Sequence, residues 1–216
     1  MVGASFTNTG TIDVDAGVLL MAGGQLVNSG LIDMAAGTTL NAHLMTFATG
    51  TTFAGAGTIT MPGQTTVTAT NLNLTLPTVL TSLLQGPGNL TVNAPFTWMS
   101  GTIDLGSGTL TVASTRTLTI ETGNDHGLVN VVLRNHGTVQ WTGGRILFQA
   151  GNNTLVNETD GIWNVGAGTF DMAGGAGQVF TNAGLLKGTG AATTTLNISA
   201  AISFTPGTTA DITIVH

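Results

Sequence analysis

Residues 6–17, FTNTGTIDVDAG, hold the pattern that decides the fold of this chain. Ile12 and Val14 alternate with polar neighbours, which is the two-residue period of a β-strand. Asn8 stands two places before Gly10, and a second glycine follows Gly10 seven places later. Gly and Asn adopt the backbone conformations of tight corners at little cost. The stretch therefore predicts a strand, a corner and a further strand.

The same pattern recurs along the chain. Six copies keep the pattern between two glycines seven places apart: Gly10/Gly17, Gly30/Gly37, Gly50/Gly57, Gly101/Gly108, Gly137/Gly144 and Gly161/Gly168. A seventh copy begins at Gly184 and ends in Ala191, with Gly190 one place early. The leading glycines lie 20, 20, 51, 36, 24 and 23 residues apart, and we expect the two wide gaps to hold coils with degraded signatures. Self-similarity at such a period indicates stacked repeats.

The repeat predicts an all-β, single-stranded parallel β-helix, that is, a β-solenoid. Three-residue linkers at the corners redirect the chain, whereas two-residue primed turns would reverse it into hairpins. Each strand then pairs with its equivalent one coil further along, at about 4.8 Å. Coils of roughly 20 residues would make about ten coils, and a rod on the order of 50 Å long. An Asn repeated at one corner is expected to form an amide ladder.

Composition narrows the range of partners and cofactors. The chain is 42% hydrophobic and only 6% charged, against roughly 25% charged residues in an average domain. Ten acidic and 4 basic side chains give a net charge of −6, so nucleic acid is not an expected partner. No apolar run approaches the roughly 20 residues that cross a bilayer, so membrane insertion by this segment is not expected. Cysteine is absent, which excludes disulfides and thiolate metal sites, and no cofactor is expected.

The whole chain, residues 1–216, is expected to be one solenoid segment excised from a longer protein. Its first residues have neither the charged nor the apolar region of a signal peptide. A strand-like run, Asp211 to Val215, stands almost at the other end. Residues 62–97 depart from the repeat, because they carry Pro62, Pro77, Pro87 and Pro95, and they predict irregular coils or a loop.

The repeated F-x-N-x-G motif resembles that of bacterial surface β-helix repeat proteins, of the filamentous-haemagglutinin-like adhesin and autotransporter-passenger type. The motif stands at Phe6–Gly10 and at Phe180–Gly184, and the tail F-T-P-G at Phe204–Gly207 resembles a common ending of such repeats. The resemblance implies a right-handed β-helix, secretion, and a role on the cell surface or in a matrix. It brings no catalytic motif, so no catalytic residue is predicted.

The most polar stretch, Glu121–His126, is the candidate for a carbohydrate site. Three of the four cationic side chains, Arg116, Arg134 and Arg145, lie near it in sequence. Hydrolysis of a glycosidic bond needs two carboxylates at a suitable separation. The candidates for binding a sugar are Trp98, Glu121, Asp125, His126 and Arg134, with Trp98 as an exposed aromatic platform near a corner.

The alternative interpretation of this stretch is a loop of solvated charges. The outward positions elsewhere are mostly Thr, Asp, Gln or Asn, which do not make a dense charged groove. His126 and His136 are ten residues apart, match no metal-binding spacing, and are expected to be exposed turn residues. Trp141 and Trp163 fall at inward positions and are expected in the core.

Asp13, Asp33 and Asp104 are expected to share one outward strand position. Asp13 and Asp33 would lie one coil apart, near about 5 Å, where closely spaced carboxylates can bind Ca²⁺. The alternative is two solvated carboxylates, whose repulsion in water is only about 0.8 kcal/mol at that separation. The next coil is expected to carry Phe53 at that position, so no metal site is predicted.

Pairs of threonines suggest a hydroxyl array that could bind ice: Thr58/Thr60, Thr109/Thr111 and Thr117/Thr119. Arg145, Asp171 and Leu31 interrupt the outward positions, which disfavours this hypothesis.

The expected function is that of a non-enzymatic structural or adhesive segment of a large secreted bacterial cell-surface or matrix protein. It would act as a rigid rod or as a fibre element that stacks end to end. The alternative is a carbohydrate-binding or carbohydrate-active β-helix of the lyase or hydrolase kind, and a minor alternative is an ice-binding solenoid. The expected partners are a glycan or another cell-surface ligand, and further copies of the chain.

Overall fold

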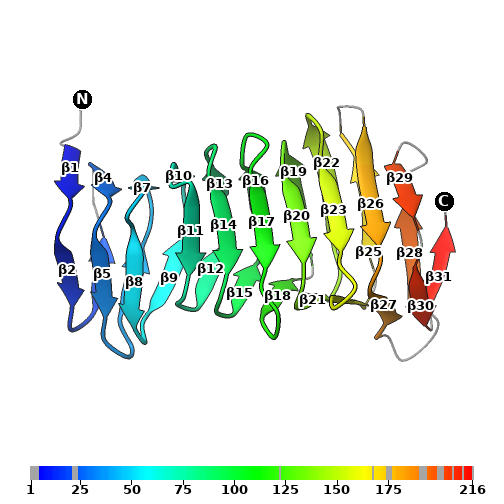
Figure 1. Ribbon diagram of the computed structural model, residues 1–216, viewed down its shortest axis with the longest axis horizontal. Helices are drawn as coiled ribbons and strands as arrows, with labels where there is room; N and C mark the ends of the chain where they lie inside the picture. Colours follow the sequence, from blue (N-terminus) through cyan, green and yellow to red (C-terminus); the bar gives the residue numbers. More distant parts are fainter. Residues whose placement is uncertain are drawn as a thin grey trace.

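The computed structural model describes residues 5–20, 24–121, 123–166, 168–173, 177–189, 194–198, 202–205, 207–210 and 212–215. These residues form 31 strands and no helix, and every pairing among them is parallel. Consecutive strands lie on three faces in turn (Figure 1). Strands three places apart in the chain pair with each other, except β8 and β11. The predicted parallel β-solenoid is therefore confirmed. The right-handed sense stays a prediction.

The strands of each face stack in chain order along the rod. The first face contains β1 (Ser5–Asn8), β4 (Gln25–Asn28), β7 (Met45–Phe47), β10 (Thr65–Val67), β13 (Leu83–Gln85), β16 (Gly101–Asp104), β19 (Asp125–Val129), β22 (Arg145–Ala150), β25 (Gly168–Met172), β28 (Thr194–Ile198) and β31 (Ile212–Val215). The third face contains β3 (Val18–Leu20), β6 (Thr39–Asn41), β9 (Thr58–Met61), β12 (Thr78–Leu80), β15 (Phe96–Trp98), β18 (Thr117–Ile120), β21 (Thr138–Trp141), β24 (Ile162–Val165), β27 (Leu185–Gly188) and β30 (Thr208–Ala210).

The second face is divided into two sheets. One sheet contains β2 (Thr11–Val14), β5 (Leu31–Met34) and β8 (Thr52–Gly55). The other contains β11 (Asn71–Leu74), β14 (Asn89–Val92), β17 (Thr109–Val112), β20 (Val132–Asn135), β23 (Thr154–Asn157), β26 (Gln178–Asn182) and β29 (Ile202–Thr205). The ladder of this face is thus interrupted once, between β8 and β11.

Three strands make one coil, so β4–β27 form eight consecutive coils of about 21 residues. Strands β1–β3 and β28–β31 continue the three faces at the two ends. The expected number of about ten coils is reached only by counting these end coils, which contain residues outside the described ranges. Paired residues differ by 18 positions between Asn71 and Asn89 and by 28 between Thr169 and Asn197, so the coil length is not constant.

The glycine pairs mark corners, but they do not form a single column. The leading glycines at 10, 30 and 50 precede strands of the second face, and those at 137, 161 and 184 precede strands of the third face. Gly101 opens β16 on the first face. The motif therefore describes one strand with its two corners, whichever face the strand lies on. The wide spacings, from Gly50 to Gly101 and from Gly101 to Gly137, each join leading glycines that belong to different faces. Gly190 and Ala191, the expected end of the seventh copy, lie outside the described residues.

The corner asparagines form amide ladders, as the sequence predicts, but at two corners and not at one. At the end of β1, Asn8 Nδ2 donates to Asn28 Oδ1 at 2.7 Å. At the second-to-third corner, Asn135 donates to Asn157 and Asn157 to Asn182, each at 2.7 Å. The same amides bond corner backbone, for example Gly137 N to Asn135 Oδ1 at 3.1 Å. Buried amide groups are thus satisfied by the coils before and after them.

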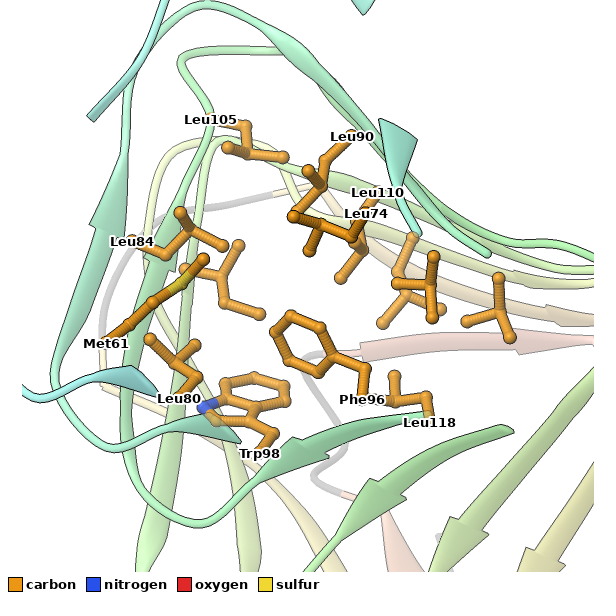
Figure 2. Packing of buried hydrophobic residues seen from close by; sticks show 14 of the residues in the cluster. Met61, Leu74, Leu80, Leu84, Leu90, Phe96, Trp98, Leu105, Leu110 and Leu118 are labelled. Carbon is orange, nitrogen blue, oxygen red and sulfur yellow. The ribbon is translucent and has the colours of Figure 1, made fainter. Parts of the chain in front are cut away.

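Inward side chains build one continuous core along the rod. On the third face the aligned positions are aliphatic or aromatic, as in the stack Phe96, Leu118, Val139, Trp163 and Leu186, all fully buried or nearly so. Figure 2 shows residues of all three faces, among them Leu84, Leu90 and Trp98, pointing into this interior. Trp141 and Trp163 are both 0% exposed, as expected.

Residues 62–97 form coils and not a loop, but they include the irregularity of the stack, because β11 does not pair with β8. Strands β10–β15 lie in this segment, and each pairs in parallel with a neighbouring coil. The prolines occupy corners, where their missing N–H is not needed for a ladder. The carbonyl groups of Pro77 and Pro95 even accept hydrogen bonds from Ile59 N and Thr78 N. Proline density is therefore compatible with this solenoid.

Candidate functional site

The five predicted sugar-binding residues do not form one site. Trp98 and His126 are both 0% exposed, so the expected aromatic platform and the expected exposed turn histidine are both wrong. Asp125 lies on the first face in β19 and Arg134 on the second face in β20. Glu121 follows β18 at the third-to-first corner and is half-buried.

His126 is a core residue that packs against Trp98. The ring centroids are 5.0 Å apart at an interplanar angle of 84°, and His126 Nε2 lies 3.1 Å from the carbonyl oxygen of Trp98. Its Nδ1 atom has no hydrogen-bond partner. Burial lowers the pKa of His126, because the charged form would lose its hydration. The clue in the sequence is the two-residue alternation of β19, which puts His126 on the same side of the strand as the buried Leu128 and opposite to the exposed Asp125.

The predicted cluster of charges is resolved into ion pairs between neighbouring coils. Arg145 donates to Asp125 through Nε at 3.0 Å and Nη2 at 2.6 Å, and to Asp171 through Nη1 at 2.9 Å. These three side chains come from β19, β22 and β25, so they join three coils on the first face. The Arg145 hydrogen bonds hold the pKa of Asp125 below its usual range. Asp125 is thus a stable carboxylate rather than a proton donor.

A second group of charges lies around the second-to-third corner. Arg134 Nη1 lies 2.5 Å from Glu158 Oε1, and His136 Nδ1 lies 2.9 Å from Asp160 Oδ1. Ser114 Oγ donates to the other oxygen of Asp160 at 3.1 Å. The bond to His136 is the main cause that lowers the pKa of Asp160. His136 is half-exposed, in line with its expected place in a turn.

The three aspartates expected at one position are separated. Asp13 and Asp33 pair in register on β2 and β5, as predicted. Asp104, however, lies in β16 on the first face, and Ala54 rather than Phe53 is aligned with Asp33 in the next coil. The described residues contain no group of three or more His, Asp or Glu side chains placed to hold a metal ion. Cation binding by Asp13 and Asp33 stays a hypothesis.

The threonine pairs are not on consecutive coils of one face. Thr58 and Thr60 lie in β9, and Thr117 and Thr119 lie in β18 of the same face, with β12 and β15 between them. The third pair lies in β17 on the second face. Val79 interrupts the outward column between Thr60 and Thr97.

A groove occupies the interruption between β8 and β11. It has a volume of about 350 Å³ and is lined by Gly50, Thr51, Thr52, Phe53, Asn71, Asn73 and Thr75. We call it the β8/β11 groove. The first and third faces continue past it, since β7 pairs with β10 and β9 with β12. The groove is therefore a local opening in one face, held by intact ladders on the other two.

The lining of the β8/β11 groove is polar and uncharged. Asn71 and Asn73 accept hydrogen bonds at Oδ1 from Asn89 and Asn93 of the next coil, at 3.3 and 3.2 Å. Thr75 Oγ1 donates to the carbonyl oxygen of Phe53 at 3.0 Å and bridges the two edges. Such a set of amides and hydroxyls can exchange hydrogen bonds with a neutral polar ligand.

The sequence did not identify this groove. Its signal in the sequence is the departure from the repeat over residues 62–97, which include Asn71, Asn73 and Thr75. Alternation places the side chains of each strand inward or outward, but it does not tell which neighbouring strands stay unpaired.

Comparison with known proteins gives no relative for this chain. No family model, no curated protein sequence and no solved structure matches it. Among the residues described, no helix is long and apolar enough to cross a bilayer.

Proposed function

We propose that this chain is a non-enzymatic structural or adhesive rod of a large secreted bacterial cell-surface or matrix protein, and that its rods associate end to end. Secretion and the cell-surface location rest on the resemblance of the F-x-N-x-G repeats. The mechanical role rests on the ladders, because hydrogen bonds tie neighbouring coils together on three faces, and on two faces at the interruption between β8 and β11 (Figure 1). Bending such a stack would disrupt several ladders at once.

The observation that carries the proposed association is the open apolar face of the first coil. Phe6 is 50% exposed, whereas its ladder partner Leu26 in the second coil is fully buried. Val18 and Leu20, 62% and 49% exposed, are aligned with the outward Thr39 and Asn41 and belong to the outer surface of the third face. The side chains of Phe6, Ile12, Leu19 and Leu26 line a hollow of about 260 Å³. Covering this surface with a further coil would remove apolar area from water.

We propose that, for residues 1–216 by themselves, the covering coil comes from a second copy of the chain. Strands β1, β2 and β3 have a ladder partner on one side only, and so do β29, β30 and β31 at the other end of the described stack. Joining these unlike ends pairs the free edges, and a head-to-tail contact that does not close on itself gives a filament. The weakly charged surface of the chain opposes such association little.

Sedimentation velocity at increasing protein concentration tests the association. We expect elongated species that grow in mass with concentration. The variant Gly10→Ala should stay monomeric, because the corner glycines at the equivalent position of the next two coils, Gly30 and Gly50, have no room for a Cβ against a carbonyl oxygen of the coil before. A Cβ at Gly10 meets only Asn8 Oδ1 at 3.9 Å, so the monomer should fold normally. A wild-type chain that stays monomeric at high concentration would refute the association.

Incubation with acidic and neutral polysaccharides tests the non-enzymatic role. We expect no new reducing ends and no unsaturated products, because the Asp125 carboxylate is fixed in an ion pair with Arg145 and its pKa is lowered. Turnover that disappears in Asp125→Ala or Arg134→Ala would favour the carbohydrate-active alternative instead.

A further inference from the structure

The interruption of the second face leaves two strand edges facing each other across the β8/β11 groove. Strand β8 pairs only with β5, and β11 pairs only with β14. No backbone hydrogen bond joins the described residues of the two strands, and the Thr75 hydroxyl makes the one bond that crosses. Main-chain groups on both edges are therefore available to solvent or to a ligand.

The size of the opening excludes a third strand as the occupant. Some Cα atoms of β8 and β11 lie within 8 Å of each other. A strand inserted between them would need two ladder spacings, about 9.6 Å. The ladders β7–β10 and β9–β12 on the other faces prevent the coils from moving apart. The volume of about 350 Å³ is instead that of a small-molecule site, since such sites begin at about 300 Å³.

The free hydrogen-bonding groups of the groove specify the chemistry of the ligand. The Oδ1 atoms of Asn71 and Asn73 are engaged by the next coil, and their Nδ2 groups have no partner among the described residues. The Thr52 hydroxyl likewise has none, and Thr75 Oγ1 can still accept. A ligand must therefore accept from two amide donors and exchange bonds with two hydroxyls.

Charge around the groove favours a neutral ligand. The lining holds no charged side chain. Amide donors repel a cation, while an anion would approach a chain of net charge −6 with Asp33 on the neighbouring strand β5. Hydroxyl groups both donate and accept hydrogen bonds, so a neutral hydroxylated ligand matches the lining.

We propose that the β8/β11 groove binds a neutral pyranose unit of a saccharide, with Thr52, Asn71, Asn73 and Thr75 as its hydrogen-bonding residues. The groove is preorganised, because Thr51 Oγ1 donates to the carbonyl oxygen of Asn28 at 2.6 Å and fixes the corner before β8. A shallow uncharged site of this kind binds weakly, with a dissociation constant on the order of millimolar. Repetition of the rod along a filament would make such binding multivalent.

This inference deepens the carbohydrate-binding alternative and does not depend on the proposed association. The groove lies between the third and fourth coils counted from β1, away from the open face of the first coil. Gly10→Ala should therefore abolish association and leave saccharide binding unchanged. Loss of saccharide binding would therefore count against the groove proposal alone, and absence of association would count against the end-to-end proposal alone.

Titration of the labelled protein with neutral methyl glycosides, followed by amide NMR shifts, tests the site. We expect saturable shifts at Thr52, Asn71, Asn73 and their neighbours, including the two side-chain amides. Glucuronate and other acidic sugars should give no such shifts. Thr52→Val and Asn73→Ala should each weaken binding about five- to tenfold.

Thr58→Val is the matched control, because Thr58 is an outward threonine of the same coil and its side chain makes no hydrogen bond to another residue of the described ranges. It should bind like the wild type, and thermal melts should confirm that all three variants are folded. Absence of shifts at the groove with every neutral glycoside, equal shifts with acidic sugars, or equal losses in Thr58→Val would overturn the proposal. Tighter binding of an extended peptide in the groove would overturn it as well.

Discussion

The side-chain amide of Asn135 donates to Oδ1 of Asn157, 22 residues later in the chain, at 2.7 Å. Asn157 in turn donates to Asn182 and to the carbonyl oxygen of Leu185. All three asparagines are buried at one corner of the rod. One residue type, repeated once per coil, thus satisfies the polar groups of a corner that would otherwise be left unpaired in the interior.

Asn157→Ala should lower the free energy of unfolding by about 1–3 kcal/mol, because it leaves buried partners of the ladder unsatisfied. Urea denaturation measures this change. Asn164→Ala is the control, since Asn164 makes a similar bond to Gln140 on the partly exposed third face. It should change the stability by less than about 0.5 kcal/mol. Equal losses in both variants would contradict a special role for the buried ladder.

Gly30→Ala should destabilise the rod by more than about 2 kcal/mol, because a Cβ there would collide with the carbonyl oxygen of Gly10. Gly10→Ala, at the same corner one coil earlier, should be nearly neutral for the monomer. Thermal melts of the two variants at low protein concentration make the comparison. Similar melting temperatures would mean that the corner relaxes freely, and that close stacking of coils is not what selects glycine.

The stability of the wild type should fall as the pH decreases through the ordinary pKa of histidine, about 6.5. Burial lowers the pKa of His126 in the folded chain. Between the pKa of His126 in the unfolded chain and its lower pKa in the folded chain, only the unfolded state binds the proton. The free energy of unfolding therefore falls as the pH decreases through this range. His126→Gln should show a smaller slope of unfolding free energy between about pH 7 and 5. An unchanged slope would show that another group causes the dependence.

Arg145→Ala should change the free energy of unfolding only slightly, although Arg145 joins Asp125 and Asp171 across three coils. The three side chains are 37–50% exposed, and solvent screens their attraction. Denaturation of the wild type and of Arg145→Ala at low and high salt checks this expectation. Most of the difference in stability between the two proteins should disappear at high salt. A large loss that does not depend on salt would indicate a structural role beyond ion pairing.

Several features of the fold follow from the sequence before any coordinates. Two-residue alternation assigns Trp141 and Trp163 to the interior, and the F-x-N-x-G repeats predict parallel coils and asparagine ladders. These predictions are sound because every coil must satisfy the same local rules of strand pairing and corner geometry. Asp13 and Asp33 were likewise aligned correctly, because exactly repeated motifs one coil apart share a register.

Other features depend on the course of the chain through all three faces. Asp104 carries the same motif as Asp13 but lies on a different face, because corners of unequal length shift the motif around the coil. His126 and Trp98 stand in polar or corner-like sequence, yet both point inward and pack on each other. The local sequence does not predict the contact between the two rings, since it joins positions 28 residues apart.

The sequence by itself determined that the chain forms stacked parallel coils with an apolar interior, because strand alternation and corner residues are local properties. Only the tertiary structure decided which strands share a face, where the second face opens between β8 and β11, and which charges meet. These outcomes depend on the register between coils. Register is set by the summed lengths of strands and corners and by the packing of the whole interior.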